Sequence, residues 1–185
     1  MPVFTLTGAS GGGKSTIIAA LKNRGFNTQP EIGRALVREQ IKQNGTALPW
    51  QDMLAFRTLL FNRSVELFDK LQNERGVYFF DRSFIDAIAS YRTTDEVVPP
   101  RYLATAKKRQ FANPILTCTP WSEIYKQDAE RKHDFEYALA DYHANIATYK
   151  DFGYDLVEIP QLPVEQRVDF ILSIQVIKQA LTDTQ

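Results

Sequence analysis

A loop of small residues near the amino end of the chain restricts its fold more than any other feature. Gly8–Thr16 reads GASGGGKST, so four of the nine glycines in the chain fall within nine residues. Residues 2–7 are short, β-branched and aromatic, which predicts a strand, and Ile17, Ile18 and Leu21 follow the loop at helical spacing. A strand, a glycine loop and a helix in succession predict the first unit of an α/β fold.

The spacing within the loop fits a site for phosphate. Gly8, Gly13, Lys14 and Ser15 follow the pattern Gly-x-x-x-x-Gly-Lys-Ser. Small side chains let successive backbone N–H groups surround an anion, and the amino end of the next helix adds N–H groups and a positive dipole. Lys14 is placed to reach the β- and γ-phosphates, and the Ser15 hydroxyl to ligate Mg²⁺. The alternative, a flexible glycine turn, is disfavoured by the strand before the loop and the helix after it.

We therefore predict that the chain binds ATP together with Mg²⁺. GTP is disfavoured, because the sequence has no Asn-Lys-x-Asp segment and no Asp-x-x-Gly after the apolar strand that ends at Asp81. Thr16 serves packing or an α-phosphate contact. The residues predicted to bind the nucleotide are Gly8, Ala9, Ser10, Gly11, Gly12, Gly13, Lys14, Ser15 and Thr16.

Strand patterns alternate with helix patterns along the rest of the chain, which predicts a mostly parallel sheet covered by helices on both faces. Ligands of such sheets bind at the carboxyl ends of the strands. One domain is predicted over residues 1–185, with a lid-like segment around residues 120–135. Further strands are predicted at 26–31, 77–81, 114–120 and 154–160, and helices at 32–45, 48–76, 82–91, 101–111, 121–153 and 164–181.

Asp81 ends the apolar run VYFFD and lies at the same predicted edge as the glycine loop. It is predicted to be catalytic together with Lys14, either holding Mg²⁺ with Ser15 or accepting the proton of a phosphoryl acceptor. The alternative is a carboxylate that only caps the next helix. Arg82 is predicted to bind substrate or phosphate, with a surface salt bridge as its alternative, and Asp86 to orient Arg82.

A second charged group follows the predicted second strand. Glu31 stands at its end, and Arg34 and Arg38 share one face of the next helix because they are four residues apart. A carboxylate beside two arginines suits a substrate with hydroxyl and anionic groups. A solvated helix face is the equally weighted alternative. Trp50 and Trp121 either wall a substrate pocket or pack in the core, and core packing is favoured.

The segment DAERKHDFE predicts a cover over the phosphates. Arg131, with Lys132 beside it, is placed to stabilise charge on the transferring phosphoryl group, so Arg131 is the third predicted catalytic residue. The alternative is a helix with ion pairs along its surface. His133 and His143 have no ligand spacing, which disfavours a zinc site.

The composition of the chain disfavours some classes of binding partner. Twenty-two basic residues balance twenty-two acidic ones, which disfavours nucleic acid and anionic membranes as partners. The single cysteine, Cys118, excludes an internal disulfide and is predicted to be a buried filler. No apolar run approaches the ~20 residues of a membrane span, so a cytoplasmic location is predicted.

The segments QPEIGRALVREQ, LPWQDMLAF, FFDRSFID and PWSEIYKQDAERKHDFEYA, together with the glycine loop, resemble the small bacterial P-loop ATPases of the NadR-like AAA-type family. The resemblance covers almost the whole chain. It implies a nucleoside- or nucleotide-kinase-like P-loop NTPase fold with three layers, whose five-stranded parallel sheet has the order 2-3-1-4-5. It also implies ATP and Mg²⁺ at the loop, a lid around Arg131, and an acceptor site near Glu31, Arg34 and Asp81.

The segment FFDRS is also similar to the strand-end signature of deoxynucleoside kinases, although Asp81 stands where Glu is more usual. The favoured function is a kinase that moves the γ-phosphoryl of ATP to a small nucleoside-like or nucleotide-like acceptor. The alternative is an ATPase that acts as a nucleotide-dependent switch on a protein partner. A binding protein without chemistry is disfavoured by the intact Lys14, Ser15 and Asp81. The sequence does not identify the acceptor or the oligomeric state.

Overall fold

The computed structural model describes residues 1–124 and 134–184. Its centre is a sheet of five parallel strands in the order β2-β3-β1-β4-β5, which confirms the predicted fold class. The strands are β1 (Val3–Gly8), β2 (Asn27–Gln29), β3 (Tyr78–Asp81), β4 (Ile115–Cys118) and β5 (Leu156–Ile159).

The register of the three middle strands gathers the glycine loop and the strand-end residues at one edge. Leu6 on β1 pairs with Asp81 on β3, and Gly8 on β1 pairs with Cys118 on β4. All six residues of β1 are buried, as is typical of a central strand in a parallel sheet covered on both faces. The carboxyl ends of β1, β3 and β4 therefore open onto the same site.

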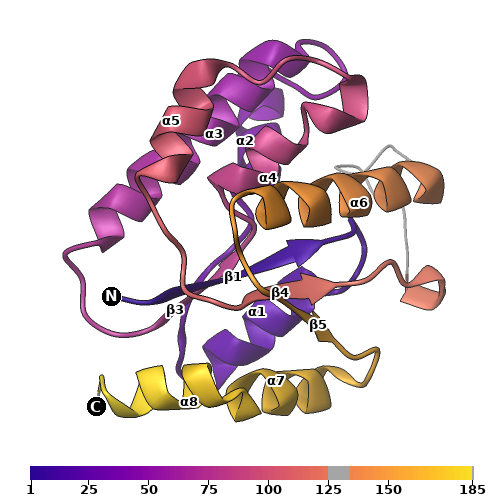
Figure 1. Ribbon diagram of the computed structural model, residues 1–185. Helices are drawn as coiled ribbons and strands as arrows, with labels where there is room; N and C mark the ends of the chain where they lie inside the picture. The colour runs from indigo at the N-terminus through magenta and orange to yellow at the C-terminus, as the bar shows by residue number, and fades with distance from the viewer. Residues whose placement is uncertain (125–133, 185) are drawn as a thin grey trace.

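Helices cover the sheet on both sides, giving three layers (Figure 1). Helices α1, α7 and α8 lie below the sheet in Figure 1, and α2 to α6 lie above it. The helices are α1 (Lys14–Asn23), α2 (Ile32–Lys42), α3 (Met53–Leu71), α4 (Phe84–Ala89), α5 (Pro100–Lys107), α6 (Phe135–Asp151), α7 (Val164–Ser173) and α8 (Gln175–Thr182), with 3₁₀ turns η1 (Arg92–Thr94) and η2 (Ser122–Ile124).

Each face of the sheet has its own apolar core. Above the sheet, aromatic rings interlock: Phe68 of α3 packs edge-on against Phe84 of α4 at 5.6 Å and against Phe111 at 4.9 Å. Below the sheet, aliphatic residues of α1 and α7 such as Ile17 and Ile171 are fully buried against the strands. The two cores fix the helices that carry the site residues, and α4 between α3 and α6 is buried along its whole length.

Several helix boundaries differ from those expected, and two of the differences have a clear local cause. The helix predicted from residue 48 begins only at Met53, because Asp52 caps it by accepting a hydrogen bond from the Ala55 N–H at 2.9 Å. The helix predicted over residues 164–181 is two helices, broken at Ile174 with an extended ψ of 123°. The Ser173 hydroxyl donates to the Phe170 carbonyl at 2.7 Å, which satisfies a carbonyl that a continuing helix would have used.

Within residues 1–124 and 134–184, no helix has the combination of length and apolar character that a membrane crossing requires. Of the helix predicted over residues 121–153, the described residues show the 3₁₀ turn η2 and α6, which begins at Phe135 after its N-cap residue Asp134. Lys132 lies outside the described residues.

Candidate active site

The backbone of the glycine loop has a shape that side chains would prevent. Gly8 and Gly13 have φ angles of 117° and 81°, in the region that favours glycine. A Cβ on Gly8 would lie 2.2 Å from the Cys118 carbonyl oxygen, and one on Gly13 would lie 2.5 Å from Arg167 Nη1. The Ala9 N–H donates to that same Cys118 carbonyl at 3.0 Å. The loop is therefore fixed against β4, and α1 begins directly after it at Lys14.

Lys14 lies buried over the loop. Its Nζ donates to the carbonyl of Ala9 at 2.7 Å and to that of Gly8 at 3.2 Å. Burial, followed by the positive charge of Arg82, lowers the pKa of Lys14 below its ordinary value. An ammonium group has three N–H donors, and an anion bound beside Lys14 would favour its charged form.

Ser15 and Asp81 lie in contact across the strand ends. The Ser15 hydroxyl donates to Asp81 Oδ2 at 2.8 Å. Asp81 Oδ1 is buried and accepts no hydrogen bond within residues 1–124 and 134–184. Burial, followed by the charge of Glu31, raises the pKa of Asp81 to about 6, although Lys14, Ser15 and Arg82 oppose the shift.

These two oxygen donors fit Mg²⁺. A buried carboxylate oxygen without a protein partner costs free energy unless a cation or a donor reaches it. Mg²⁺ prefers oxygen ligands and is usually held by one or two protein groups together with phosphates and water. Among the described residues, no group of three or more histidine, cysteine, aspartate or glutamate side chains is arranged to hold a metal ion.

Arg82 lies at the centre of a charged network. Its φ of 68° is unusual for a residue with a side chain. Nη2 donates to Asp141 Oδ2 at 2.8 Å, Nη1 donates to Asp86 Oδ1 at 3.1 Å, and Nε lies 3.8 Å from Glu31 Oε1. Burial disfavours its charge, but these three carboxylates outweigh burial and hold the pKa of Arg82 well above its ordinary value. Arg82 is thus not in a surface salt bridge.

Asp86 and Ser83 connect this network to the fold. Asp86 accepts hydrogen bonds from the hydroxyls of Thr7 at 2.6 Å and Tyr149 at 2.7 Å, and from the Ser83 N–H at 2.9 Å. Ser83 caps α4, with Asp86 completing a capping box. The alternative that Asp81 caps this helix is therefore wrong. Asp86 also meets Arg82 as expected.

The residues predicted on α2 are only partly brought to the site. Glu31 precedes α2, and its Oε2 lies 3.5 Å from Nε of Arg34, so this pair faces Arg82 and the glycine loop. Arg38 is exposed and is not among the residues that line the clefts of the described structure. Arg131 lies outside the described residues.

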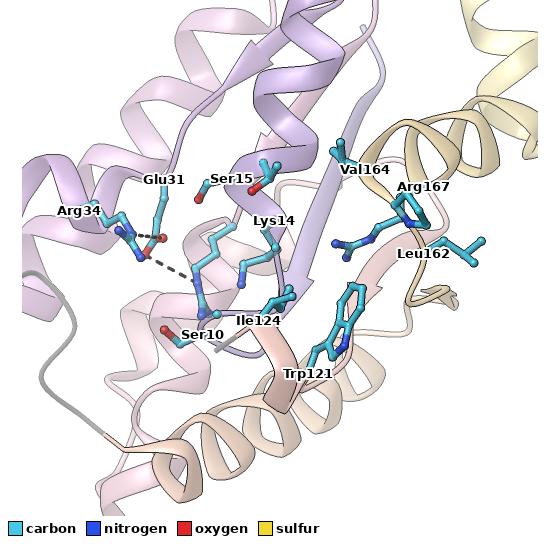
Figure 2. A pocket seen from close by; sticks show the side chains of 15 residues that line it. Ser10, Lys14, Ser15, Glu31, Arg34, Trp121, Ile124, Leu162, Val164 and Arg167 are labelled. Atoms are coloured by element: carbon cyan, nitrogen blue, oxygen red, sulfur yellow. Dashed lines mark ion pairs between the residues drawn. The ribbon is translucent and has the colours of Figure 1, made fainter. Parts of the chain in front are cut away.

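A first cleft, of about 470 Å³, lies over the glycine loop. Figure 2 shows Lys14 between two groups of side chains: Glu31 and Arg34 on one side, and Trp121 and Arg167 on the other. Leu162 also lines it, in the loop after β5. Trp121 thus borders the site, contrary to the favoured expectation of core packing. This cleft is named the phosphate cleft.

A second cleft, of about 370 Å³, lies between α2, α3, α4 and α6. Apolar side chains of α3 and the segment before it form much of its lining, and charged side chains form another part. Its lining includes Val37, Trp50, Met53, Phe56, Leu60, Arg57, Arg82, Asp86 and Asp141. Trp50 is therefore also a cleft residue. This cleft is named the side cleft.

Two buried arginines border these clefts and were not expected. Arg167 on α7 donates from Nη2 to the Gly12 carbonyl at 2.9 Å and to Cys118 Sγ at 3.3 Å, and it lines the phosphate cleft. Arg57 on α3 is 1% exposed and lines the side cleft. Each arginine occupies the apolar face of its helix: Arg57 stands four residues before buried Phe61, and Arg167 directly precedes buried Val168. A charged residue on the apolar face of a helix was the sequence signal that could have identified these two arginines as buried.

Comparison with known proteins agrees with this fold. Similar solved structures include thymidylate kinase from Candida albicans (16% identity, TM-score 0.71, 97% of this chain and 92% of that chain covered). Deoxyadenosine kinase from M. mycoides with bound dATP is 13% identical, with a TM-score of 0.60 and coverage of 93% and 97%. Shikimate kinase from Acinetobacter baumannii in complex with shikimate is 16% identical, with a TM-score of 0.57 and coverage of 97% and 95%.

At these identities the likeness shows the fold, which is that of P-loop kinases. No curated protein matches the chain by sequence. A family model described as AAA domain matches residues 3–167, which is most of the chain and includes the glycine loop, Asp81 and Arg167. The expected resemblance to P-loop ATPases and kinases is confirmed, and the chain belongs to the AAA domain family.

Proposed function

We propose that this protein is a kinase that uses ATP and Mg²⁺ to phosphorylate a hydroxyl group of a small molecule. One observation carries the proposal: the phosphate cleft and the side cleft share Ser10, Glu31 and Arg82, so they meet next to the glycine loop. A phosphoryl donor in one cleft and an acceptor in the other would place their reacting ends at this junction. Such positioning provides much of the rate enhancement in phosphoryl transfer.

On the donor side, the backbone N–H groups of the loop and of the first turn of α1 hold the phosphates, and Lys14 contacts the β- and γ-phosphates. Ser15 and Asp81 would hold Mg²⁺, and their 2.8 Å contact supports this role. Mg²⁺ bound there would supply positive charge beside the phosphate oxygens on which negative charge develops. Arg131, which the sequence predicts to lie in a cover over the phosphates, is proposed to stabilise charge on the transferring phosphoryl group.

On the acceptor side, Glu31 is placed to take the proton of the hydroxyl. Glu31 lines both clefts, whereas Oδ2 of Asp81 already accepts from Ser15. The acceptor oxygen bonds to the γ-phosphorus, the bond from that phosphorus to the bridging oxygen breaks, and the hydroxyl proton passes to the carboxylate. Arg82 is a positioning residue because it holds Glu31, Asp86 and Asp141 around the junction.

The test measures ADP release by the full chain with ATP and Mg²⁺, with and without a panel of nucleosides, nucleotides and other small hydroxyl compounds. Stimulation by an acceptor, with that acceptor recovered as its phosphate ester, is the expected result. Equal ADP release with every acceptor and without any acceptor would contradict the kinase and favour the ATPase that acts on a protein partner. Lys14→Ala serves as the control for hydrolysis by a contaminant.

A further inference from the structure

The charged groups of the side cleft limit what its occupant can be. Arg57 and Arg82 are the two guanidinium groups among the described residues that line it. Arg57 is buried, and its two terminal nitrogens are engaged: Nη1 binds Glu96, and Nη2 donates to the Ser90 carbonyl at 2.7 Å and to the Thr94 hydroxyl at 2.9 Å. Both N–H groups of Nη2 are thus used within the fold. Its Nε has no hydrogen-bond partner among the described residues.

Arg82 is engaged as well. Its Nη2 donates to Asp141 and to the Gly8 carbonyl, its Nη1 donates to Asp86, and Glu31 lies beside its Nε. A guanidinium that already faces three carboxylates offers little to a further anion. An incoming phosphate would have to displace carboxylates that are held in place by other bonds, such as that from Asn145 Nδ2 to Asp141 Oδ1 at 3.0 Å.

Carboxylates outnumber guanidiniums in the lining of the side cleft: Glu31, Asp86 and Asp141 line it together with Arg57 and Arg82. Outside this lining, Glu96 pairs with Arg57 and Arg34 pairs with Glu31, so these two further charges offset each other. At the junction, where the reacting end of the acceptor would lie, the groups shared by the two clefts are Ser10, Glu31 and the engaged Arg82. Ionised carboxylates accept hydrogen bonds and repel anions, so hydroxyl groups fit this lining and a phosphomonoester does not.

The side cleft also has apolar and aromatic lining residues. Trp50, Met53, Phe56 and Leu60 are among them, and the volume of about 370 Å³ falls within the roughly 300–1,000 Å³ of small-molecule sites. A cleft lined by both aromatic and carboxylate side chains suits a molecule that has a flat ring and hydroxyl groups.

We infer that the side cleft binds a nucleoside-type acceptor, with a ring and hydroxyl groups that are uncharged or cationic and with no phosphate group. This inference rests on the proposed kinase function and narrows it, because it excludes nucleoside monophosphates as acceptors. The reaction then forms a phosphomonoester from a hydroxyl group instead of a diphosphate from a monophosphate.

The experiment compares purine and pyrimidine nucleosides with their own 5′-monophosphates on the full chain. Binding of each compound is measured by calorimetry in the presence of a non-hydrolysable ATP analogue and Mg²⁺, and turnover by ADP release with ATP. At least one nucleoside is expected to bind at least about tenfold more tightly than its monophosphate, because like charges across a buried site disfavour binding. The same nucleoside is expected to stimulate ADP release.

A matched pair of variants tests the cause. Asp141→Asn removes one carboxylate that lines the side cleft and keeps the size of the side chain. Asp151→Asn removes a carboxylate of the same helix that pairs with Arg92 and does not line the cleft. Asp141→Asn is expected to reduce the preference for nucleoside over monophosphate by about threefold or more, and Asp151→Asn to leave it unchanged. Thermal unfolding of both variants checks that they fold.

The outcomes separate the two proposals. A monophosphate that binds as tightly as its nucleoside, or a preference that Asp141→Asn does not change, overturns the acceptor inference whether or not turnover occurs. If no compound of the panel binds detectably, the acceptor inference is overturned as well. Nucleoside binding with the expected preference but no stimulation of ADP release supports the cleft assignment and overturns the kinase.

Discussion

The phosphate cleft and the side cleft meet at the same residues, yet they are built in different ways. One short segment, between Ser10 and Thr16, supplies six of the residues that line the phosphate cleft, and its shape follows from the glycines and from the pairing of Gly8 with β4. The side cleft is assembled from side chains of α2, α3, α4 and α6, which are distant in the sequence. This difference fits the proposed roles of the two clefts: the first for the triphosphate, which many ligands share, and the second for a particular acceptor.

The largest expected effect falls on the phosphate cleft. Lys14→Ala removes the ammonium group that lies over the loop, so turnover with ATP should fall at least about a hundredfold, and ATP affinity should fall with it. Lys22→Ala, at an exposed position near the end of the same helix, is the matched control. Steady-state kinetics and ATP titration measure both. Wild-type ATP affinity in Lys14→Ala would contradict the assignment of the loop.

Asp81→Asn is expected to lower turnover by about a hundredfold and yet to stabilise the folded chain near neutral pH. The pKa of Asp81 is raised from 3.8 to about 6 in the folded state, mainly by burial and then by Glu31. The folded state thus binds more protons than the unfolded state between these two values. The favourable contribution of protonated Asp81 is present below 3.8 and is lost as pH rises through about 6.

The asparagine variant does not carry this charge. Its free energy of unfolding should exceed that of the wild type by about 3 kcal/mol at pH values well above 6, and by much less near pH 4. Urea unfolding at about pH 4.5 and about pH 7.5 measures the difference. Asp86→Asn is the contrasting variant, because Asp86 accepts several hydrogen bonds, and it should destabilise the chain at both pH values. A pH-independent effect of Asp81→Asn would contradict a shifted pKa.

The side cleft should respond separately. Arg57→Met keeps a long apolar side chain but removes the guanidinium that joins Ser90, Thr94 and Glu96, so the free energy of unfolding should fall by about 2–3 kcal/mol. Acceptor KM should rise, while ATP affinity stays within about twofold of wild type. Arg101→Met, on α5 outside both clefts, is the control. A loss of ATP affinity equal to the loss of acceptor affinity would show that the clefts are not independent.

The difference in construction also explains what the sequence predicted. The glycine loop, the parallel sheet and the position of Asp81 depend on local patterns that leave periodic or motif signals, whereas the strand order was implied by the family resemblance alone. Glu31 and Arg34 were expected near the site because they follow a strand, but Arg38 shows that helical spacing alone does not bring a side chain to a cleft.

The side cleft left no continuous signal. Arg57 meets Ser90 and Glu96 only after α3 and α4 have packed together through aromatic side chains. The roles of Trp50 and Trp121 likewise depend on which helix faces which cleft. Because the sequence does not show this, core packing was favoured for both, whereas each of them lines a cleft. Buried charges on apolar helix faces were the one local sign of these contacts.

The smallest expected effects come from these two tryptophans, and they test the separation of the clefts most directly. Trp50→Ala removes an aromatic wall of the side cleft, so acceptor KM should rise about five- to tenfold while ATP KM stays constant. Trp121→Ala, beside Arg167 in the phosphate cleft, should raise ATP KM by a similar factor and leave acceptor KM unchanged. In the double variant the two losses should add, because the side chains line different clefts. A clear departure from additivity would mean that donor and acceptor contact one shared wall, and the assignment of two adjoining clefts would then be wrong.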